Sequence, residues 1–581
     1  MKKLINRYGK VALSLIVALA VFLHWRIGYP CALSFQEQFQ LFLFDDDYLL
    51  SRLAEPGGAA RYVGEFLVQF YNNVTLGALI ITLTFLLVQR LTWRLMRRVT
   101  TGLPARWYVV SFLPMAVLWY LMGDQNVMMS FTIAYLLALV AMLLFLWVDK
   151  RFKGVVPGML LMFVGTPVFY WLAGSTLWMV VAFAVCYRLF FRRQWGRAPF
   201  VVLYAVACIL FSQWLVAFPL NVLLRGIDYY RFPNIVPYVM FFLLLLSAVL
   251  PFIVSSLSRK ASKSVALVAD IIAALAFVAV PFGFDAKTYE LMDYDYLVRT
   301  HQWEKILQKA EKQRPDLPMS ISATNLALGM TGQLGDRAFS YPQHGVEGLL
   351  PPFQREFSSQ LITSEVYYQL GLVNTAERFA FEAMEALPDY NKSGRVMKRL
   401  AQVEIINGEY AVARRYLEVL KKTLFYGQWA QRTEALLGDD QAVNQHPDYG
   451  RLRRYRLTND FLFSEQEVDK MFGQLYQKDP QNQLAMQYLL LYPLLERNMQ
   501  KFMQYVGIVE QQQQYMPTMV QEGIAFAYLQ SHQQLPKNAL SPMVMQRFSD
   551  FAHAYTSGRG DASQLEPFRN TVWYYLSVGN N

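Results

Sequence analysis

The sequence predicts an all-α protein in two parts: a polytopic membrane bundle of about nine helices, then a soluble domain of paired helices. Three observations lead to this prediction. Long apolar segments fill the first half of the 581-residue chain. Basic residues gather in alternate connections between these segments. From residue 285 onward, apolar residues recur at helical spacing, without the alternation that is typical of strands.

The membrane half is predicted to be residues 1–284. A helix needs about 20 apolar residues to cross a bilayer core about 30 Å thick, so the shorter segments require tilt or flanking aromatic residues. The predicted spans are approximately residues 11–25, 74–88, 107–122, 127–148, 155–171, 177–191, 200–218, 236–257 and 265–282. The first segment lacks a small-residue cleavage site at its end, which indicates an uncleaved anchor.

Charge is distributed unequally along the chain and predicts an orientation. Residues 1–284 hold 24 Lys and Arg against 10 Asp and Glu, and the remainder holds 30 against 33. Nineteen of those 24 basic residues lie at the N-terminus or in alternate connections. The positive-inside rule therefore places the N-terminus in the cytoplasm. Nine crossings put residues 285–581 on the other side, so we expect a multi-pass inner-membrane protein with a periplasmic C-terminal domain.

The net charge of +11 does not indicate a nucleic-acid partner, because the basic residues form short clusters between apolar segments. Three cysteines do not imply a disulfide framework. The six histidines are scattered, and neither a Walker loop nor a G-x-S-x-G elbow is present. These absences leave no certain cofactor or nucleophile to expect.

The soluble half carries a repeat pattern, clearest over residues 364–388. The positions that define the pattern are Tyr367, Gly371, Ala376, Ala383 and Pro388, and a second copy has Leu400, Ala401, Gly408 and Ala413. This spacing resembles the tetratricopeptide repeat, in which small residues let two antiparallel helices approach closely. The resemblance implies an α-solenoid over residues 285–581 whose concave surface binds a protein or peptide partner. Alternatively, the repeats only pack against the membrane half.

The longest outside connection of the membrane half spans residues 28–73. Aromatic residues alternate with glutamines and glutamates over residues 35–44 and again over 62–71, which is typical of helices lying in the membrane interface. Between them lie the acidic run Asp45-Asp46-Asp47 and the turn residues Pro56-Gly57-Gly58. This connection is where we expect any chemistry.

A first outside loop with two juxtamembrane helices and an acidic residue resembles the multi-pass glycosyltransferases of the GT-C fold. The resemblance implies transfer of a sugar or related group from a polyprenyl-phosphate carrier in the membrane lipid. Asp45, Asp46 and Asp47 are then the catalytic candidates, because a carboxylate can deprotonate an acceptor hydroxyl or hold a divalent cation. Arg225 and Arg231, in another outside connection, are the candidates for binding the carrier's phosphate.

Each candidate also has a structural interpretation. Three aspartates after an amphipathic helix can end that helix at the water surface, and Arg225 and Arg231 can be interfacial side chains. Asp270 lies inside the ninth apolar segment, where a charge is costly unless it is functional or paired near the membrane edge. A transporter would need further buried carboxylates, so Asp270 alone favours that function least.

Two functions follow from the sequence. The first is a GT-C-type transferase whose repeat domain binds the acceptor or a partner. The second is a non-catalytic scaffold whose membrane half anchors the repeats in a periplasmic protein complex. The organisation also resembles an uncharacterised family of bacterial multi-pass membrane proteins with a tetratricopeptide-like C-terminal domain, which implies no activity.

Overall fold

The computed structural model describes residues 2–152, 155–232, 235–260, 263–351, 357–387, 392–457, 467–510, 516–536, 540–557 and 562–578. Over these ranges the chain forms helices, and the only β pairing is an isolated bridge between Val127 and Tyr230. The all-α prediction is therefore confirmed. Two compact units result. Unit 1 is Met1–Tyr289 with Pro388–Ser393 and Lys422–Gly427, and unit 2 is Glu290–Leu387, Gly394–Lys421 and Gln428–Asn581.

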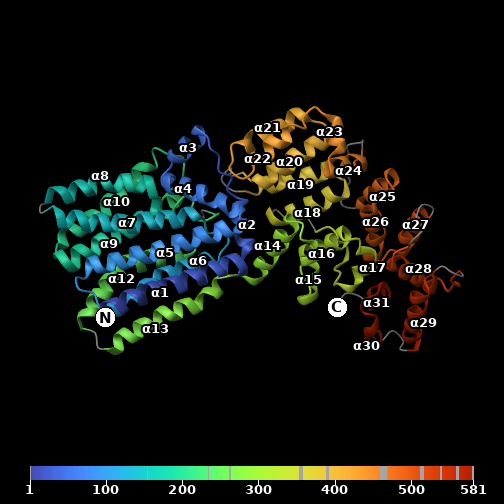
Figure 1. Ribbon diagram of the computed structural model, residues 1–581, viewed down its shortest axis with the longest axis horizontal. Coiled ribbons are helices and arrows are strands. Elements are labelled where there is room, and N and C mark those ends of the chain that lie inside the picture. Colours follow the sequence, from blue (N-terminus) through green and yellow to red (C-terminus); the bar gives the residue numbers. More distant parts are fainter. Residues whose placement is uncertain are drawn as a thin grey trace. The chain divides into compact units, whose positions relative to one another are not determined.

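Unit 1 is a bundle of long apolar helices, and shorter helices lie in the connections between them (Figure 1). Its helices are α1 Lys2–Leu23, α2 Pro30–Glu37, α3 Asp46–Leu53, α4 Gly58–Val68, α5 Val74–Val99, α6 Leu113–Leu121, α7 Met129–Arg151, α8 Val155–Ala173, α9 Leu177–Tyr187, α10 Ala198–Ser212, α11 Leu220–Arg225, α12 Tyr238–Lys260 and α13 Lys263–Ala279. Helices α5, α7, α9 and α12 pack side by side at its centre.

Six helical stretches among the described residues are long and apolar enough to cross a membrane, fewer than the nine predicted. They are Tyr8–Gly28, Val74–Val99, Met129–Arg151, Met162–Arg192, Tyr238–Arg259 and Ser264–Gly283. One of them, Met162–Arg192, joins two predicted segments through the 3₁₀ turn Gly174–Thr176. Ala105–Leu121 and Ala198–Ser212 are apolar but shorter. The prediction of several membrane-length helices is thus confirmed in this coarser form.

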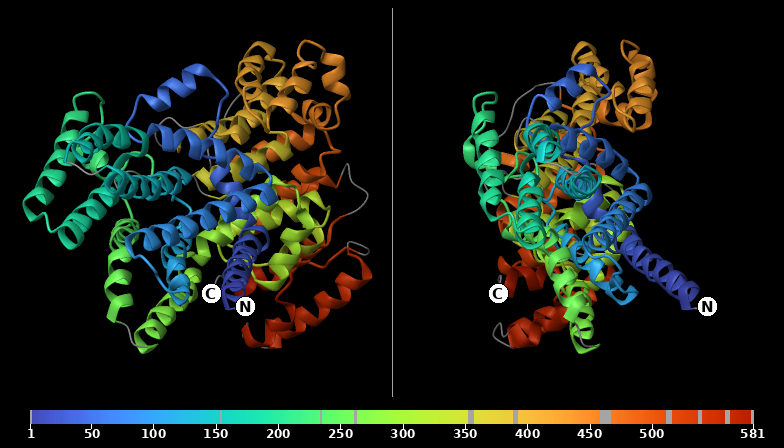
Figure 2. Two further views of the ribbon diagram at one scale, coloured as in Figure 1. Left: turned by 60° about the vertical axis from the view of Figure 1, so that its left-hand side comes forward. Right: turned by 90° about the vertical axis from the view of Figure 1, so that its left-hand side faces the viewer.

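The first and last of these stretches lie at the edge of unit 1. Each is only 17% buried, whereas the other four are at least half buried. Figure 2 shows α1 extending along the outside of its unit, with the N-terminus at its outer end. Apolar side chains on both helices, such as Leu15 and Leu275, are therefore exposed in the protein and suited to contact with lipid.

The first long connection folds differently from the two interfacial helices predicted. The prediction of a helix over residues 35–44 is wrong in its bounds, because α2 ends at Glu37 and no helix covers residues 40–45. The reason is burial: Phe39 and Phe42 are 3% and 2% exposed, so the segment packs inside the unit. Its backbone is paired there, since Leu41 and Phe44 donate to the carbonyl oxygens of Lys392 and Lys422.

Unit 2 is a succession of short helices. They are α14 Ala286–Arg299 (its first residues in unit 1), α15 Trp303–Lys312, α16 Pro318–Met330, α17 Leu334–Arg337, α18 Phe357–Leu370, α19 Val373–Glu385, α20 Gly394–Asn407, α21 Tyr410–Lys421, α22 Gly427–Glu434, α23 Asp440–Gln445, α24 Pro447–Tyr455, α25 Val468–Lys478, α26 Gln483–Leu495, α27 Met499–Val509, α28 Thr518–Gln530, α29 Pro542–Ser557, α30 Ala562–Leu565 and α31 Val572–Val578.

Two helical hairpins of unit 2 follow the repeat spacing locally. The helices α18 and α20 each end at a glycine in the left-handed region, Gly371 with φ +98° and Gly408 with φ +86°, and the next helix then packs back on the first. Ala376 and Ala413 are fully buried. Pro388 lies outside the described residues. The paired helices are thus present, while a continuous solenoid remains a prediction.

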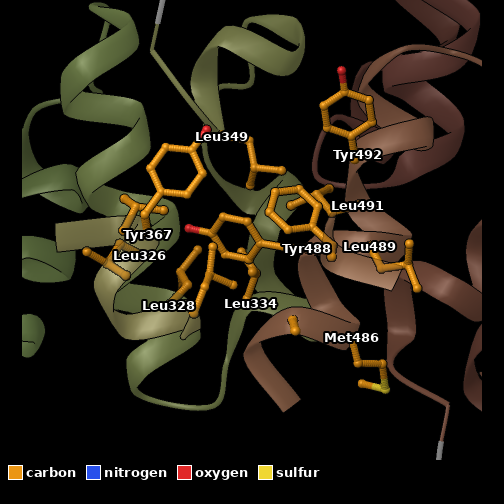
Figure 3. Packing of buried hydrophobic residues seen from close by; sticks show 14 of the residues in the cluster. Leu326, Leu328, Leu334, Leu349, Tyr367, Met486, Tyr488, Leu489, Leu491 and Tyr492 are labelled. Carbon is orange, nitrogen blue, oxygen red and sulfur yellow. The ribbon is translucent and has the colours of Figure 1, made fainter. Parts of the chain in front are cut away.

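The core of unit 2 joins helices that are far apart in the chain. Figure 3 shows Leu326 of α16, Tyr367 of α18 and Tyr488 of α26 meeting in one buried cluster. Tyr488 is fully buried and Tyr367 is 6% exposed. Burying aromatic side chains of this size contributes more than 1.5 kcal/mol each, to order of magnitude, so the cluster is a major source of stability for the unit.

Candidate functional site

The first long connection is fastened to the end of the helix bundle by close backbone contacts. Gly64 of α4 lies against α7, where an added Cβ would be only 2.7 Å from the Ser130 nitrogen. The turn before α4 is tied to α8, because Gly57 donates to the Trp171 carbonyl oxygen at 2.9 Å and the Trp171 indole donates to the Leu53 carbonyl at 2.8 Å. The connection is therefore an ordered layer of unit 1.

A cluster of buried charges lies at the centre of this layer, around Arg61 of α4. Its guanidinium contacts Asp228 at 2.7 Å, Glu55 at 3.0 Å and Glu65 at 3.0 Å. Glu65 also accepts from Arg52 at 2.9 Å and from the Tyr48 hydroxyl. We call these residues, Tyr48, Arg52, Glu55, Arg61, Glu65 and Asp228, the Arg61 cluster.

Burial and charge act in opposite directions on Arg61, whose side chain is 6% exposed. Burial alone would lower the pKa of the guanidinium, but the charges of Asp228, Glu65 and Glu55 outweigh it and raise the pKa above its ordinary value. Burial and the neighbouring Glu65 carboxylate likewise raise the pKa of the Tyr48 hydroxyl. Arg61 therefore stays charged and Tyr48 stays protonated at any physiological pH.

The connection between α11 and α12 supplies Asp228 and is itself held by backbone bonds. The Ser130 hydroxyl donates to the Asp228 carbonyl oxygen, and Met128 donates to the Tyr229 carbonyl oxygen at 3.0 Å. Arg231 donates from its backbone to Asn126 at 2.8 Å. The Arg61 cluster thus joins α3, α4 and this distant connection. Because its carboxylates already accept hydrogen bonds from guanidinium groups, the cluster is arranged to hold segments together.

The predicted catalytic aspartates lie at the start of α3. Asp46 and Asp47 are exposed in its first turn, and Asp45 precedes the helix in an extended conformation. Asp45 forms an ion pair with Lys422 at 3.1 Å, which is also exposed. Carboxylates in the first turn stabilise a helix through its dipole, so this placement serves α3 whether or not the aspartates are catalytic.

The two predicted phosphate-binding arginines have different environments. Arg225 is the last residue of α11 and is exposed. Arg231 is 9% exposed, and its guanidinium carbon lies 3.9 Å from the centre of the Phe39 ring. Within the described ranges, no ion pair joins either arginine to the aspartate run. The structure thus brings Arg231 to the buried aromatic segment of the first connection and leaves Arg225 at the surface.

Asp270 lies in α13, half-buried within the stretch Ser264–Gly283. The 3₁₀ segment Ala105–Phe112, which contains Arg106, packs against this helix. An arginine near the edge is the kind of partner that makes a carboxylate in a membrane helix tolerable.

A cavity of about 810 Å³ lies in unit 2, between the segment after α17 and the C-terminal residues. Its walls combine aromatic and basic side chains, among them Tyr341, Tyr574, Tyr575, Arg314 and Arg569. Hydrogen bonds orient the rings: Tyr341 donates to Glu311 at 3.1 Å and Tyr575 to the Leu495 carbonyl oxygen at 3.1 Å. Arg314 is exposed in the wall. The cavity offers aromatic faces and two guanidinium groups to a ligand, and the exposed Glu347 carboxylate also lies in its wall.

A second cavity, of about 240 Å³, lies among α7, α8, α9 and α10 and is lined mostly by apolar residues such as Phe145, Phe169 and Val181. No candidate residue of the first connection lines it. In the part of the chain that the structure describes, no group of three or more His, Cys, Asp or Glu is arranged to hold a metal ion. Cys31, Cys186 and Cys208 are not joined in disulfides.

Sequence reasoning missed the Arg61 cluster. Glu55, Arg61 and Glu65 lie near one another in the chain, and Arg61 and Glu65 have the i, i+4 spacing of a helical ion pair. That spacing was a usable signal for the local pair. Asp228 gave no such signal, because only the packing of the α11–α12 connection against α7 brings it to Arg61.

Comparison with known proteins places both units in one family. No curated protein matches the chain, and no solved structure matches it. The family described as "Family of unknown function (DUF6057)" matches residues 5–579, which is nearly the whole chain. The chain therefore belongs to the DUF6057 family, whose function is unknown.

Proposed function

We propose that this protein is a membrane-anchored binding protein, in which the N-terminal half lies in the bacterial inner membrane and the C-terminal half engages a protein or peptide partner in the periplasm. The observation that carries the proposal is the 810 Å³ cavity of unit 2. Ligand sites are concave and combine apolar walls with a few polar groups, as this cavity does. The positive-inside distribution supports the orientation.

The chemistry of the cavity favours an extended segment that carries an acidic group. Tyr341, Tyr574 and Tyr575 present rings on which an apolar side chain can pack. Arg314 offers a guanidinium that can bind a carboxylate with two parallel hydrogen bonds. Arg569 is already paired with Glu566 at 3.2 Å, so Arg314 is the stronger determinant of charge preference.

The Arg61 cluster supports the non-catalytic interpretation of the first connection. A general base must offer a carboxylate to the substrate, yet Glu65 is buried, the Asp228 side chain is only 12% exposed, and Arg61 engages both. Their arrangement suits the anchoring of the connection to the bundle.

Site-specific photo-cross-linking in living cells tests the binding proposal. A photoreactive residue at His344, which is exposed in the cavity wall, should give a discrete adduct, whereas one at the exposed Glu418 of α21 should not. The adduct at His344 should weaken at least about fivefold when Arg314→Glu is introduced, because charge reversal repels an acidic segment. Equal labelling at both positions, or labelling insensitive to Arg314, would overturn the proposal.

A second candidate is the GT-C-type transferase, and two observations favour keeping it. Asp46 and Asp47 are exposed and open to an acceptor. The apolar cavity among α7, α8, α9 and α10 is suited to part of a polyprenyl chain. Each of Asp45, Asp46 and Asp47 should be replaced with Asn and transfer from polyprenyl-phosphate sugars measured, with and without a divalent cation. Loss of transfer by about 100-fold or more in one variant would support catalysis. Unchanged transfer in all three variants would remove their catalytic role.

A further inference from the structure

A cluster of arginines lines a cavity of about 510 Å³ near the C-terminal ends of α5 and α7, within unit 1. The lining residues are Arg94, Arg97, Arg98, Leu143 and Trp147. All three arginines are exposed, and none of them forms an ion pair with a carboxylate in the ranges that the structure describes. The acidic residue nearest in sequence to Trp147, Asp149, is engaged by Arg192 instead. The cavity is therefore positively charged, with guanidinium groups available to an anion.

The arginines continue an exposed apolar face of α5. Leu83 and Leu87 are 55% and 47% exposed, and they precede Arg94 and Arg98 at spacings that keep all four on one side of the helix. An anion that carried hydrocarbon chains would therefore find apolar surface directly beside the guanidinium groups.

Helix α7 repeats the same arrangement. Val140, Leu144 and Trp147 are 48%, 48% and 50% exposed and share one face that ends at the cavity. Tryptophan is enriched where the hydrocarbon core meets the headgroups, because its ring is apolar and its N–H is polar. Two apolar faces thus lead to one group of arginines, from two helices that pack on each other.

The end of α5 is also fixed beside the cavity. The Lys150 ammonium group of α7 donates to the Arg98 carbonyl oxygen at 2.7 Å and so ties the last turn of α5 to α7. It adds a fourth cation close to Arg98. Guanidinium groups bind phosphate oxygens with paired hydrogen bonds, and a basic pocket between membrane helices suits a lipid headgroup.

We propose that this cavity binds the phosphate headgroup of an anionic phospholipid, whose acyl chains lie along the exposed apolar faces of α5 and α7. A lipid is favoured over a free phosphate ion because only a lipid would use those two faces. This site is separate from the cavity of unit 2 that is proposed to bind a partner. The lipid proposal therefore does not depend on the proposed binding function.

Native mass spectrometry of the full-length protein, released from nanodiscs of phosphatidylglycerol and phosphatidylcholine, tests the proposal. The wild-type protein should retain phosphatidylglycerol in preference to phosphatidylcholine. The triple variant Arg94→Gln, Arg97→Gln, Arg98→Gln should lose this preference by about tenfold, since it removes three charges from the site. A matched variant with Arg378, Arg414 and Arg415 of unit 2 changed to Gln loses the same charge from exposed positions and should keep the preference.

Loss of three arginines also weakens the signal for membrane orientation, so a second variant is needed. Replacing the same three arginines with Lys keeps the charge and should reduce the preference about threefold, because the paired hydrogen bonds are lost. An equal loss in the unit 2 control, no preference in the wild type, or an unchanged lysine variant together with an unchanged glutamine variant would overturn the proposal. Displacement of the lipid by inorganic phosphate alone would overturn the assignment to a lipid.

Discussion

The Arg61 guanidinium of α4 lies 2.7 Å from the Asp228 carboxylate, which the connection between α11 and α12 supplies. This pair joins two parts of unit 1 that are distant in the chain. Arg61 has two further carboxylate partners and is 6% exposed, so removing it takes one guanidinium from three carboxylates, of which Glu65 keeps Arg52.

Arg61→Met should destabilise the protein by about 3–5 kcal/mol, because it removes the buried cation that three carboxylates share. The measurement is chemical unfolding of the full-length protein in detergent. Arg225→Met is the control, since Arg225 is an exposed arginine of the same region, and it should cost less than about 1 kcal/mol. Equal destabilisation by the two variants would show that Arg61 has no special role.

Gly64→Ala should destabilise unit 1 by about 1–3 kcal/mol, because the added Cβ meets the Ser130 backbone at 2.7 Å. Gly507→Ala in α27 is a matched substitution with no atom within 4 Å of its Cβ. At that exposed position of a helix, alanine should stabilise by about 0.5–1 kcal/mol. Thermal unfolding of the two variants should therefore move in opposite directions, and a shift of the same sign would contradict the packing of α4 on α7.

Glu522→Gln should raise stability at pH 8 and leave it nearly unchanged at pH 4. Burial raises the pKa of Glu522 to about 7, above its ordinary value of 4.5. The stability linked to protonation of Glu522 is thus fully present below pH 4.5 and is lost as the pH rises through 7. Gln keeps an oxygen for the Val572 N–H, which donates to Glu522 at 2.8 Å. At pH 8 the variant should gain about 3 kcal/mol in the free energy of unfolding, measured by chemical denaturation. The control Glu566→Gln, at an exposed position, should show no such gain.

Glu365→Gln should make the protein less sensitive to acid. Burial alone would raise the pKa of Glu365, but the charge of Arg399, with His301 and Gln369, lowers it to about 2. Because this is below the ordinary value of 4.5, the contribution is present above pH 4.5 and is lost as the pH falls toward 2. The difference in free energy of unfolding between pH 6 and pH 3 should be smaller in the variant by about 2 kcal/mol, because part of the contribution is still present at pH 3. An unchanged pH dependence would mean that the Arg399 pair is not formed.

Reporter fusions test the predicted topology. A fusion after Lys263 and one after Asp285 flank the last apolar stretch, so they should report opposite sides of the membrane. Activity on the same side for both fusions would refute the crossing of α13. Fusions on either side of Ala105–Leu121 and of Ala198–Ser212 would establish whether these shorter helices also cross.

The helical class and the presence of membrane-length apolar helices were predictable from residue patterns. Helix-forming periodicity and apolar length are local properties, so they can be read from a segment without its neighbours. The turn glycines Gly371 and Gly408 were also predictable, because a left-handed turn residue favours glycine wherever it occurs. The interpretation that Asp45, Asp46 and Asp47 end a helix over residues 35–44 was wrong, because α2 ends at Glu37 and the aspartates lie at the start of α3.

Other features depended on contacts between distant segments. The sequence pattern placed Phe39 and Phe42 on one face of an interfacial helix, but they lie outside any helix and are buried within unit 1. By sequence, Asp228 is an ordinary loop residue. The connection between α11 and α12 packs on Ser130, and this brings Asp228 to Arg61. The sequence by itself determined the helical class, the apolar stretches and the clusters of basic residues, because these depend on local composition. Only the tertiary structure decided which charges are buried together and which arginines are available to a ligand. Ion pairing and burial depend on distance in space, which the order of residues does not give.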